Sequence, residues 1–260
     1  MIEIVKLTVY GNKRITRKPI LNEISAILDN RSVIIGPNGS GKTSLLKAIM
    51  GLIDYEGSIR IELNSKPSGR AIINSNIIDI YKVMNIKVKE IIGLYSEAMN
   101  SDEEEIIDII KDLRISHILD SKLTRLSTGE SKLLGFAMAL GLEGNLVLLD
   151  EPFENLDISR KEIVVSKINQ CNKDILIVTH DLQTIKRTNL TKFYLMISGK
   201  LEGGLPIEQI DKLYINLRKK DDYLFSFQFG SRIIWISRND GEYPLFSFNS
   251  VDELIGDDQA

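Results

Sequence analysis

The chain has 260 residues, of which 43% are hydrophobic and 27% are charged, an ordinary composition for a globular protein. A formal net charge of -3 gives no general reason to expect nucleic acid as a partner. The single cysteine, Cys171, excludes an internal disulfide, and no apolar run approaches the roughly 20 residues that cross a bilayer. The composition therefore favours a cytoplasmic chain with one large α/β domain, alone or with a small appendage.

The N-terminal part of the chain predicts strands followed by a helix. Alternating apolar residues predict strands within residues 2–7 and 20–27, with a turn near Gly11. The short apolar run at residues 32–35 predicts a buried strand. A glycine-rich turn follows it, and apolar residues at helical spacing then predict a helix over residues 42–50.

The middle of the chain predicts helices first and then buried strands. We expect a hairpin around residues 55–63 and helices over most of residues 79–125. The acidic run that begins at Asp102 suits the positive end of a helix dipole. The unbroken apolar runs at 146–149 and 175–178 are typical of strands buried in a parallel sheet.

The C-terminal part has a different pattern. Aromatic residues alternate strictly from Tyr223 to Phe229, and Asn239-Asp-Gly is a turn signal. This pattern predicts a small antiparallel meander over residues 221–250, within a β-rich extension that covers 221–260. Two interpretations stay open for the extension: a β-layer that buries its aromatic face against the main domain, or a module that regulates or stabilises a dimer.

A phosphate-binding loop is the strongest functional signal, because residues 36–43 match the pattern G-x-x-x-x-G-K-[ST] in full. Glycines allow the backbone to wrap around a polyphosphate with its N–H groups pointing inward. Lys42 adds a positive charge for the β- and γ-phosphates, the Thr43 hydroxyl can ligate Mg²⁺, and the following helix presents its N-terminus to the same anion. The candidate nucleotide-binding residues of this loop are Gly36, Pro37, Asn38, Gly39, Ser40, Gly41, Lys42, Thr43 and Ser44.

Two carboxylates, Asp150 and Glu151, follow the apolar run at 146–149. Ligands bind at the carboxyl ends of parallel strands, so Asp150 is expected to emerge beside the phosphate-binding loop. We expect Asp150 to hold Mg²⁺, directly or through a water, and Glu151 to orient and deprotonate the attacking water. An Asp-Glu pair at a strand end is commonly no more than a solvated turn, but its place after a phosphate-binding loop favours the catalytic interpretation.

The sequence from Leu126 to Glu130, Leu-Ser-Thr-Gly-Glu, resembles the signature, usually L-S-G-G-Q, of ABC-family nucleotide-binding domains. Its serine can cap a helix and its glycine allows an anion to approach closely. Three further motifs fall in the family's order and extend the resemblance over about residues 1–205. The segment 154–157 resembles the D-loop, His180 resembles the switch histidine that contacts the γ-phosphate, and Tyr10 resembles the aromatic residue that stacks on adenine. The residues that the resemblance adds to the candidate site are Tyr10, Ser127, Thr128, Gly129, Glu130, Asp157 and His180.

The chain departs from the family's pattern at two places. No glutamine follows the strand after the phosphate-binding loop, where the family has a residue that reaches Mg²⁺; Asn76 is the favoured substitute and Asn74 the alternative. In the signature, Thr128 stands where the family usually has glycine, and Glu130 where it usually has glutamine. The first departure bears on coupling or turnover rather than on nucleotide binding.

The resemblance implies a P-loop NTPase core of ABC type at residues 1–220, with an N-terminal antiparallel β-subdomain and an inserted helical subdomain at about 77–140. It implies an ATP- and Mg²⁺-dependent ATPase that pairs with a second ATPase subunit, identical or paralogous, so that each signature acts on the partner's nucleotide. Transmembrane permease subunits would be further partners, holding the chain at the inner face of the membrane. The alternative is a soluble ABC ATPase of an assembly system such as iron–sulfur cluster biogenesis. The transported substrate and its direction stay open.

Overall fold

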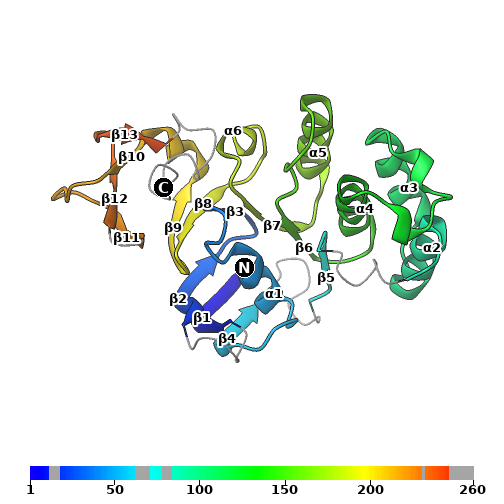
Figure 1. Ribbon diagram of the computed structural model, residues 1–260, viewed down its shortest axis with the longest axis horizontal. Helices are drawn as coiled ribbons and strands as arrows, with labels where there is room; N and C mark the ends of the chain where they lie inside the picture. The colour runs from blue at the N-terminus through cyan, green and yellow to red at the C-terminus, as the bar shows by residue number, and fades with distance from the viewer. Residues whose placement is uncertain (12–17, 63–70, 78–83, 230–231, 246–260) are drawn as a thin grey trace. The chain divides into compact units, whose positions relative to one another are not determined.

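The computed structural model describes residues 1–11, 18–62, 71–77, 84–229 and 232–245 (Figure 1). The chain forms two compact units. The first unit comprises residues 1–62 and 178–260, and the second comprises residues 63–177. The turn predicted near Gly11 continues into residues outside the described part.

The first unit begins with an antiparallel sheet in the order β2-β1-β4. Its strands are β1 (Ile2–Tyr10), β2 (Pro19–Leu28) and β4 (Glu56–Ile61). The buried apolar residues of β1 are Ile2, Ile4, Leu7 and Val9. Their alternation shifts by one residue between Ile4 and Leu7, where the pairing with β2 is irregular. The expected hairpin at 55–63 is wrong for the described residues, since residues 56–61 form the single strand β4, whose partner is β1, with Ile2 opposite Ile61. Residue 63 lies outside the described part. Alternating apolar residues predict a strand but not the partner that it pairs with.

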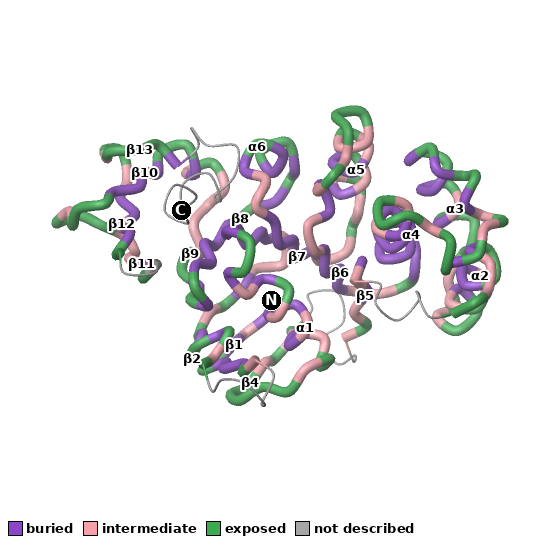
Figure 2. The backbone as a smooth tube through the Cα atoms, in the orientation of Figure 1, coloured by how far each residue is buried: buried purple, intermediate pink, exposed green. Residues whose placement is uncertain are grey.

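A second sheet has the strand order β5-β6-β7-β3-β8-β9. Its strands are β3 (Arg31–Ile35), β5 (Ile73–Ser75), β6 (Leu146–Asp150), β7 (Asp174–Thr179), β8 (Lys192–Ile197) and β9 (Lys200–Pro206). Strand β3 pairs in parallel with β8, and β5 pairs in parallel with β6, whereas β9 runs antiparallel to β8. Strand β7 begins in the second unit and ends in the first. The apolar residues of β3, β6 and β7 are buried, which confirms the predicted buried strands (Figure 2).

The helices follow the sequence pattern in part: two α-helices lie in the stretch expected to be helical at 79–125, and its residues 79–83 lie outside the described part of the chain. They are α1 (Lys42–Ile49), α2 (Val88–Met99), α3 (Glu103–Asp112), α4 (Thr128–Gly141), α5 (Ile158–Gln170) and α6 (Leu182–Ile185), with short 3-10 helices η2 (Ser116–Ile118), η3 (Leu123–Arg125) and η4 (Ile207–Lys212). The side chain of Asp102 accepts a hydrogen bond from the Glu104 N–H and so caps α3. Helix α4 contacts α3, and ten of its residues are buried. It is therefore the central helix of the second unit.

The C-terminal sheet starts earlier than the predicted extension, of which residues 230–231 and 246–260 lie outside the described part of the chain. It has the order β11-β12-β10-β13 and consists of β10 (Leu213–Asn216), β11 (Phe225–Phe229), β12 (Arg232–Arg238) and β13 (Tyr243–Pro244). Strand β10 lies before residue 221 and pairs with both β12 and β13, so the sheet is not a simple meander. Strand β11 contacts β8 and β9, and Phe227 is 1% exposed. The sheet thus buries part of its aromatic face against the rest of the first unit.

Within the described residues, no helix has the length and apolar character needed to cross a membrane.

Candidate nucleotide-binding site

The phosphate-binding loop lies between β3 and α1, as its sequence predicted. Strand β3 is fully buried over Val33, Ile34 and Ile35, and it fixes the point at which the loop begins. Two glycines of the loop have left-handed backbones, Gly39 with a φ of 76° and Gly41 with a φ of 105°. A Cβ on Gly41 would also lie 2.6 Å from the Leu21 Cδ2 atom. The loop therefore needs glycine both for its conformation and for its packing.

Two polar side chains of this loop are buried. Lys42 is 5% exposed, and its Nζ donates hydrogen bonds to the carbonyl oxygens of Gly36 (2.7 Å) and Pro37 (2.9 Å). Ser40 is 3% exposed, and its hydroxyl has no hydrogen-bond partner within the described residues. A buried hydroxyl without a partner costs free energy unless a ligand binds it. A cationic amine, a buried hydroxyl and the N-terminus of α1 together suit a polyphosphate.

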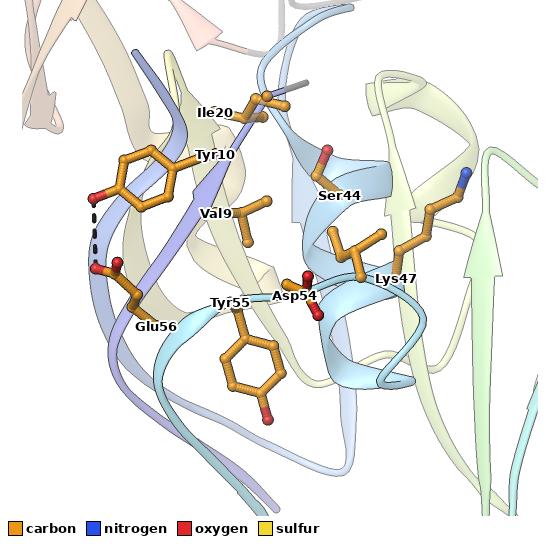
Figure 3. Close-up of a pocket in the computed structure, with 10 residues that line it drawn as sticks. Val9, Tyr10, Ile20, Ser44, Lys47, Asp54, Tyr55 and Glu56 are labelled. Carbon is orange, nitrogen blue, oxygen red and sulfur yellow. Dashed lines mark hydrogen bonds between the residues drawn. The ribbon is translucent and has the colours of Figure 1, made fainter. Parts of the chain in front are cut away.

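A pocket of about 550 Å³ lies beside the start of α1 (Figure 3). Its lining residues are Val9, Tyr10, Gly11, Ile20, Ser44, Lys47, Ile53, Asp54, Tyr55 and Glu56. The Tyr10 hydroxyl donates to Glu56 Oε2 at 3.4 Å, and Tyr10 remains 44% exposed. Figure 3 shows Tyr10 on one side of the pocket and Ser44 on the helix opposite. An exposed aromatic ring in a pocket next to a phosphate-binding loop suits a nucleotide base.

His180 follows β7 within the first unit. The Gly36 N–H donates to the carbonyl oxygen of Thr179 at 3.2 Å, so the residue before His180 is bonded to the first residue of the phosphate-binding loop. The next residue, Asp181, caps α6 by accepting a hydrogen bond from the Thr184 N–H. The structure thus brings the backbone at His180 next to the loop.

In the second unit, Asp150 ends β6 and Glu151 follows it with a left-handed φ of 45°. The amide of Asn76 bonds the backbone of Asp150 twice: Oδ1 accepts from its N–H (2.7 Å) and Nδ2 donates to its carbonyl oxygen (2.9 Å). The Asn74 amide instead donates to the carbonyl oxygens of Leu142 (2.9 Å) and Glu143 (3.2 Å). Of the two asparagines considered at this position, Asn76 is therefore the one bonded to Asp150. Its predicted role as a Mg²⁺ ligand stays a prediction.

The signature forms the N-terminus of α4. The Ser127 hydroxyl accepts from the Glu130 N–H, and Glu130 Oε2 accepts from both the N–H and the hydroxyl of Ser127, which is a complete capping box. His117 Nε2 lies 2.7 Å from Glu130 Oε1. Hydrogen bonds from the Ser127 side chain, then from His117, lower the pKa of Glu130 to about 2. The glutamate that departs from the family's glutamine is therefore ionised and held in place.

The D-loop segment connects β6 to α5. Asp157 caps α5 by accepting from the Arg160 N–H at 2.9 Å, and Asn155 has a left-handed φ of 59°. Glu154 forms an ion pair with Lys132 of α4, which ties this segment to the signature helix. The sequence did not predict the contacts of Lys132 or His117, because each joins residues that lie far apart in the chain.

No group of three or more histidine, cysteine or acidic side chains that could hold a metal ion occurs in the described part of the chain. Mg²⁺ in nucleotide sites is usually held by one or two protein oxygens together with phosphates and waters. The oxygen donors of Thr43 and Asp150 are of the type that Mg²⁺ prefers.

The comparisons with known proteins agree with these features. A model of the ABC transporter family matches residues 24–154. The zinc import ATP-binding protein ZnuC of Wolbachia sp. subsp. Brugia malayi is 31% identical over 184 residues, covering 68% of this chain and 71% of that protein. The energy-coupling factor transporter ATP-binding protein EcfA of Aster yellows witches'-broom phytoplasma is 31% identical over 238 residues, covering 84% of each chain.

Among solved structures, a proposed cobalt transport ATP-binding protein, cbiO-2, superposes with a TM-score of 0.83 at 28% identity. It covers 98% of this chain and 99% of its own. The fold and the phosphate-binding loop define a P-loop ATPase domain of ABC type. The chain belongs to the ABC transporter family, as an ATP-binding domain.

Proposed function

We propose that this chain is the ATP-hydrolysing subunit of an ABC transporter and that it drives transport through separate transmembrane permease subunits. The observation that carries the proposal is the phosphate-binding loop: two left-handed glycines, the buried Lys42 amine and the buried Ser40 hydroxyl at the start of α1. The adjacent pocket beside Tyr10, within the same unit, supports the proposal that the adenine base binds there. Together these features support ATP as the ligand.

Phosphoryl transfer depends on positioning and on stabilising charge rather than on covalent catalysis. In this proposal Lys42 and the first N–H groups of α1 hold the β- and γ-phosphates, and His180 contacts the γ-phosphate. Glu151 accepts the proton of the attacking water, whose oxygen bonds to the γ-phosphorus as the bond to the ADP oxygen breaks. Bound Mg²⁺, with Thr43 and Asp150 as its protein ligands, would neutralise charge on the phosphate oxygens.

Two ATPase subunits would act together. We propose that the N-terminus of α4, with Ser127, Thr128, Gly129 and Glu130, binds the γ-phosphate of the partner's ATP, and that Asp157 lies at the same interface. A contact made only when ATP is present gives the closed pair its higher affinity, and hydrolysis then releases the pair. This cycle would supply the motion that moves the permease subunits.

The likeness to cbiO-2 covers 98% of the chain and so takes in the C-terminal sheet, whereas ZnuC matches 68% of the chain. We therefore propose that the chain serves a transporter of the kind that cbiO-2 and EcfA serve. The assembly-system alternative predicts a different cellular distribution. A transport subunit should be recovered with membranes through its permease partners, at their cytoplasmic face, and should be released by alkaline carbonate.

The ATPase assignment is tested by steady-state hydrolysis with and without Mg²⁺. Lys42→Ala should reduce kcat by about a hundredfold or more, because it removes the charge that faces the transferring phosphoryl group. Lys111→Ala is the control for the loss of one lysine charge, since Lys111 is an exposed lysine at the end of α3 that pairs with Asp108. Hydrolysis that survives in Lys42→Ala, or that is absent from the unaltered chain, would contradict the assignment.

A further inference from the structure

Strand β5 ends before its neighbour β6 does, and one side chain continues the pairing. The parallel register joins Ile73 with Leu146 and Ser75 with Leu148, but β6 runs on to Asp150. The Asn76 N–H donates to the Leu148 carbonyl oxygen at 3.4 Å as the last backbone bond of this ladder. The Asn76 side chain then makes the next two bonds, both to the backbone of Asp150.

These two bonds require a carboxamide. Oδ1 accepts from the Asp150 N–H at 2.7 Å, and Nδ2 donates to the Asp150 carbonyl oxygen at 2.9 Å. An amide offers a donor and an acceptor in one plane, whereas a carboxylate offers acceptors alone. Asn76 is 7% exposed, so a lost bond would leave a buried polar group unsatisfied. Turning the amide toward a cation would break both bonds.

Asp150, whose backbone Asn76 holds in this way, precedes Glu151, a residue with a strained backbone. Glu151 has a left-handed φ of 45°, which a non-glycine residue keeps only where its surroundings enforce it. On its C-terminal side, the Glu151 carbonyl oxygen accepts from the Glu154 N–H at 3.2 Å. On its N-terminal side, the Asn76 amide fixes the peptide groups of Asp150. The backbone of Glu151 is thus held from both directions.

We propose that Asn76 is a positioning residue, whose amide fixes the backbone of Asp150 and thereby the directions in which the Asp150 and Glu151 side chains leave β6. This role replaces that of a Mg²⁺ ligand at this position, and it rests on the proposed ATPase function. It also accounts for the departure from the family's pattern. A glutamine at residue 76 is longer by one methylene group and would not fit the two bonds that Asn76 makes.

Asn76→Asp separates the two roles, because aspartate is the better Mg²⁺ ligand but cannot donate to the Asp150 carbonyl oxygen. A positioning role predicts that kcat falls by about tenfold to a hundredfold, as small misplacements of catalytic groups do. ATP affinity measured without Mg²⁺ should stay within about twofold of the unaltered chain, because Lys42 and the base pocket are untouched. Asn76→Gln, which restores the family's residue, should also lower kcat.

Asn74→Asp is the matched control. Asn74 lies on β5, is 6% exposed and donates to two backbone carbonyls, but its partners are Leu142 and Glu143. Asn74→Asp should lower the melting temperature about as much as Asn76→Asp does, but the folded protein should keep its kcat. Wild-type kcat in Asn76→Asp or Asn76→Gln, or an equal loss of kcat in Asn74→Asp, would overturn the positioning role. An unaltered chain without Lys42-dependent hydrolysis would instead overturn the ATPase function on which the inference rests.

Discussion

The phosphate-binding loop at residues 36–43 is held by backbone conformation, whereas the signature at residues 127–130 is held by side chains. In the first region, a buried strand, left-handed glycines and a helix start leave few alternatives to the observed geometry. In the second, Ser127, Glu130 and His117 form a hydrogen-bonded group at the N-terminus of α4. The first region matches its family's pattern in full, and the second departs from it at two residues. The departures from the family's pattern in these two regions thus fall in the one that side chains hold.

The largest effect is expected from a change to the phosphate-binding loop, and it should appear as a loss of ATP affinity. Gly41→Ala adds a Cβ that would lie 2.6 Å from Leu21 Cδ2, at a φ of 105° that an alanine rarely adopts. We expect ATP binding to fall by a hundredfold or more, on the order of 3 kcal/mol. Gly39→Ala is the control for packing alone, because its φ of 76° imposes a similar left-handed strain while its Cβ meets nothing within 4 Å. Titration with a fluorescent ATP analogue measures both, and equal losses in the two variants would weaken the packing argument.

A smaller effect is expected in the base pocket of the same unit. Tyr10→Ala removes the ring that lines the pocket and should weaken ATP binding by about tenfold, which corresponds to roughly 1.4 kcal/mol of stacking and burial. Tyr10→Phe keeps the ring but loses the hydroxyl that donates to Glu56, so its affinity should stay close to that of the unaltered chain. If Tyr10→Phe and Tyr10→Ala bind ATP equally poorly, the ring is not what binds the base.

The smallest effect is expected in the signature at residues 127–130, whose contribution to the stability of the fold depends on pH. The pKa of Glu130 is lowered to about 2, so its interactions stabilise the fold fully above its ordinary pKa of 4.5 and are lost as pH falls toward 2. Glu130→Gln should therefore lower the melting temperature slightly at pH 6, and the difference should shrink as the pH approaches 3. Asp120→Asn is the control, since its ion pair with Lys89 is exposed. A difference in melting temperature that grows toward pH 3 would contradict this prediction.

Sequence alone predicted the elements around the phosphate-binding loop because the motif and the flanking apolar runs are local. It failed where partners lie far apart in the chain: β4 pairs with β1, and β10 joins the C-terminal sheet from before residue 221. The amide of Asn76 was predicted to bind Mg²⁺, and nothing in the sequence indicated that it bonds the backbone of Asp150. Nothing in the sequence indicated the contact between His117 and Glu130 either, since 13 positions of chain separate these residues.

We propose that two ATPase subunits close on ATP and that Glu151 ends the closed state by activating water. The most direct test is size-exclusion chromatography of Glu151→Gln with ATP and Mg²⁺, because this variant keeps the shape of the side chain but removes its basicity. We expect a dimer that requires ATP and that disappears when Lys42→Ala is added. A Glu151→Gln protein that binds ATP and still elutes as a monomer would contradict self-pairing of this chain.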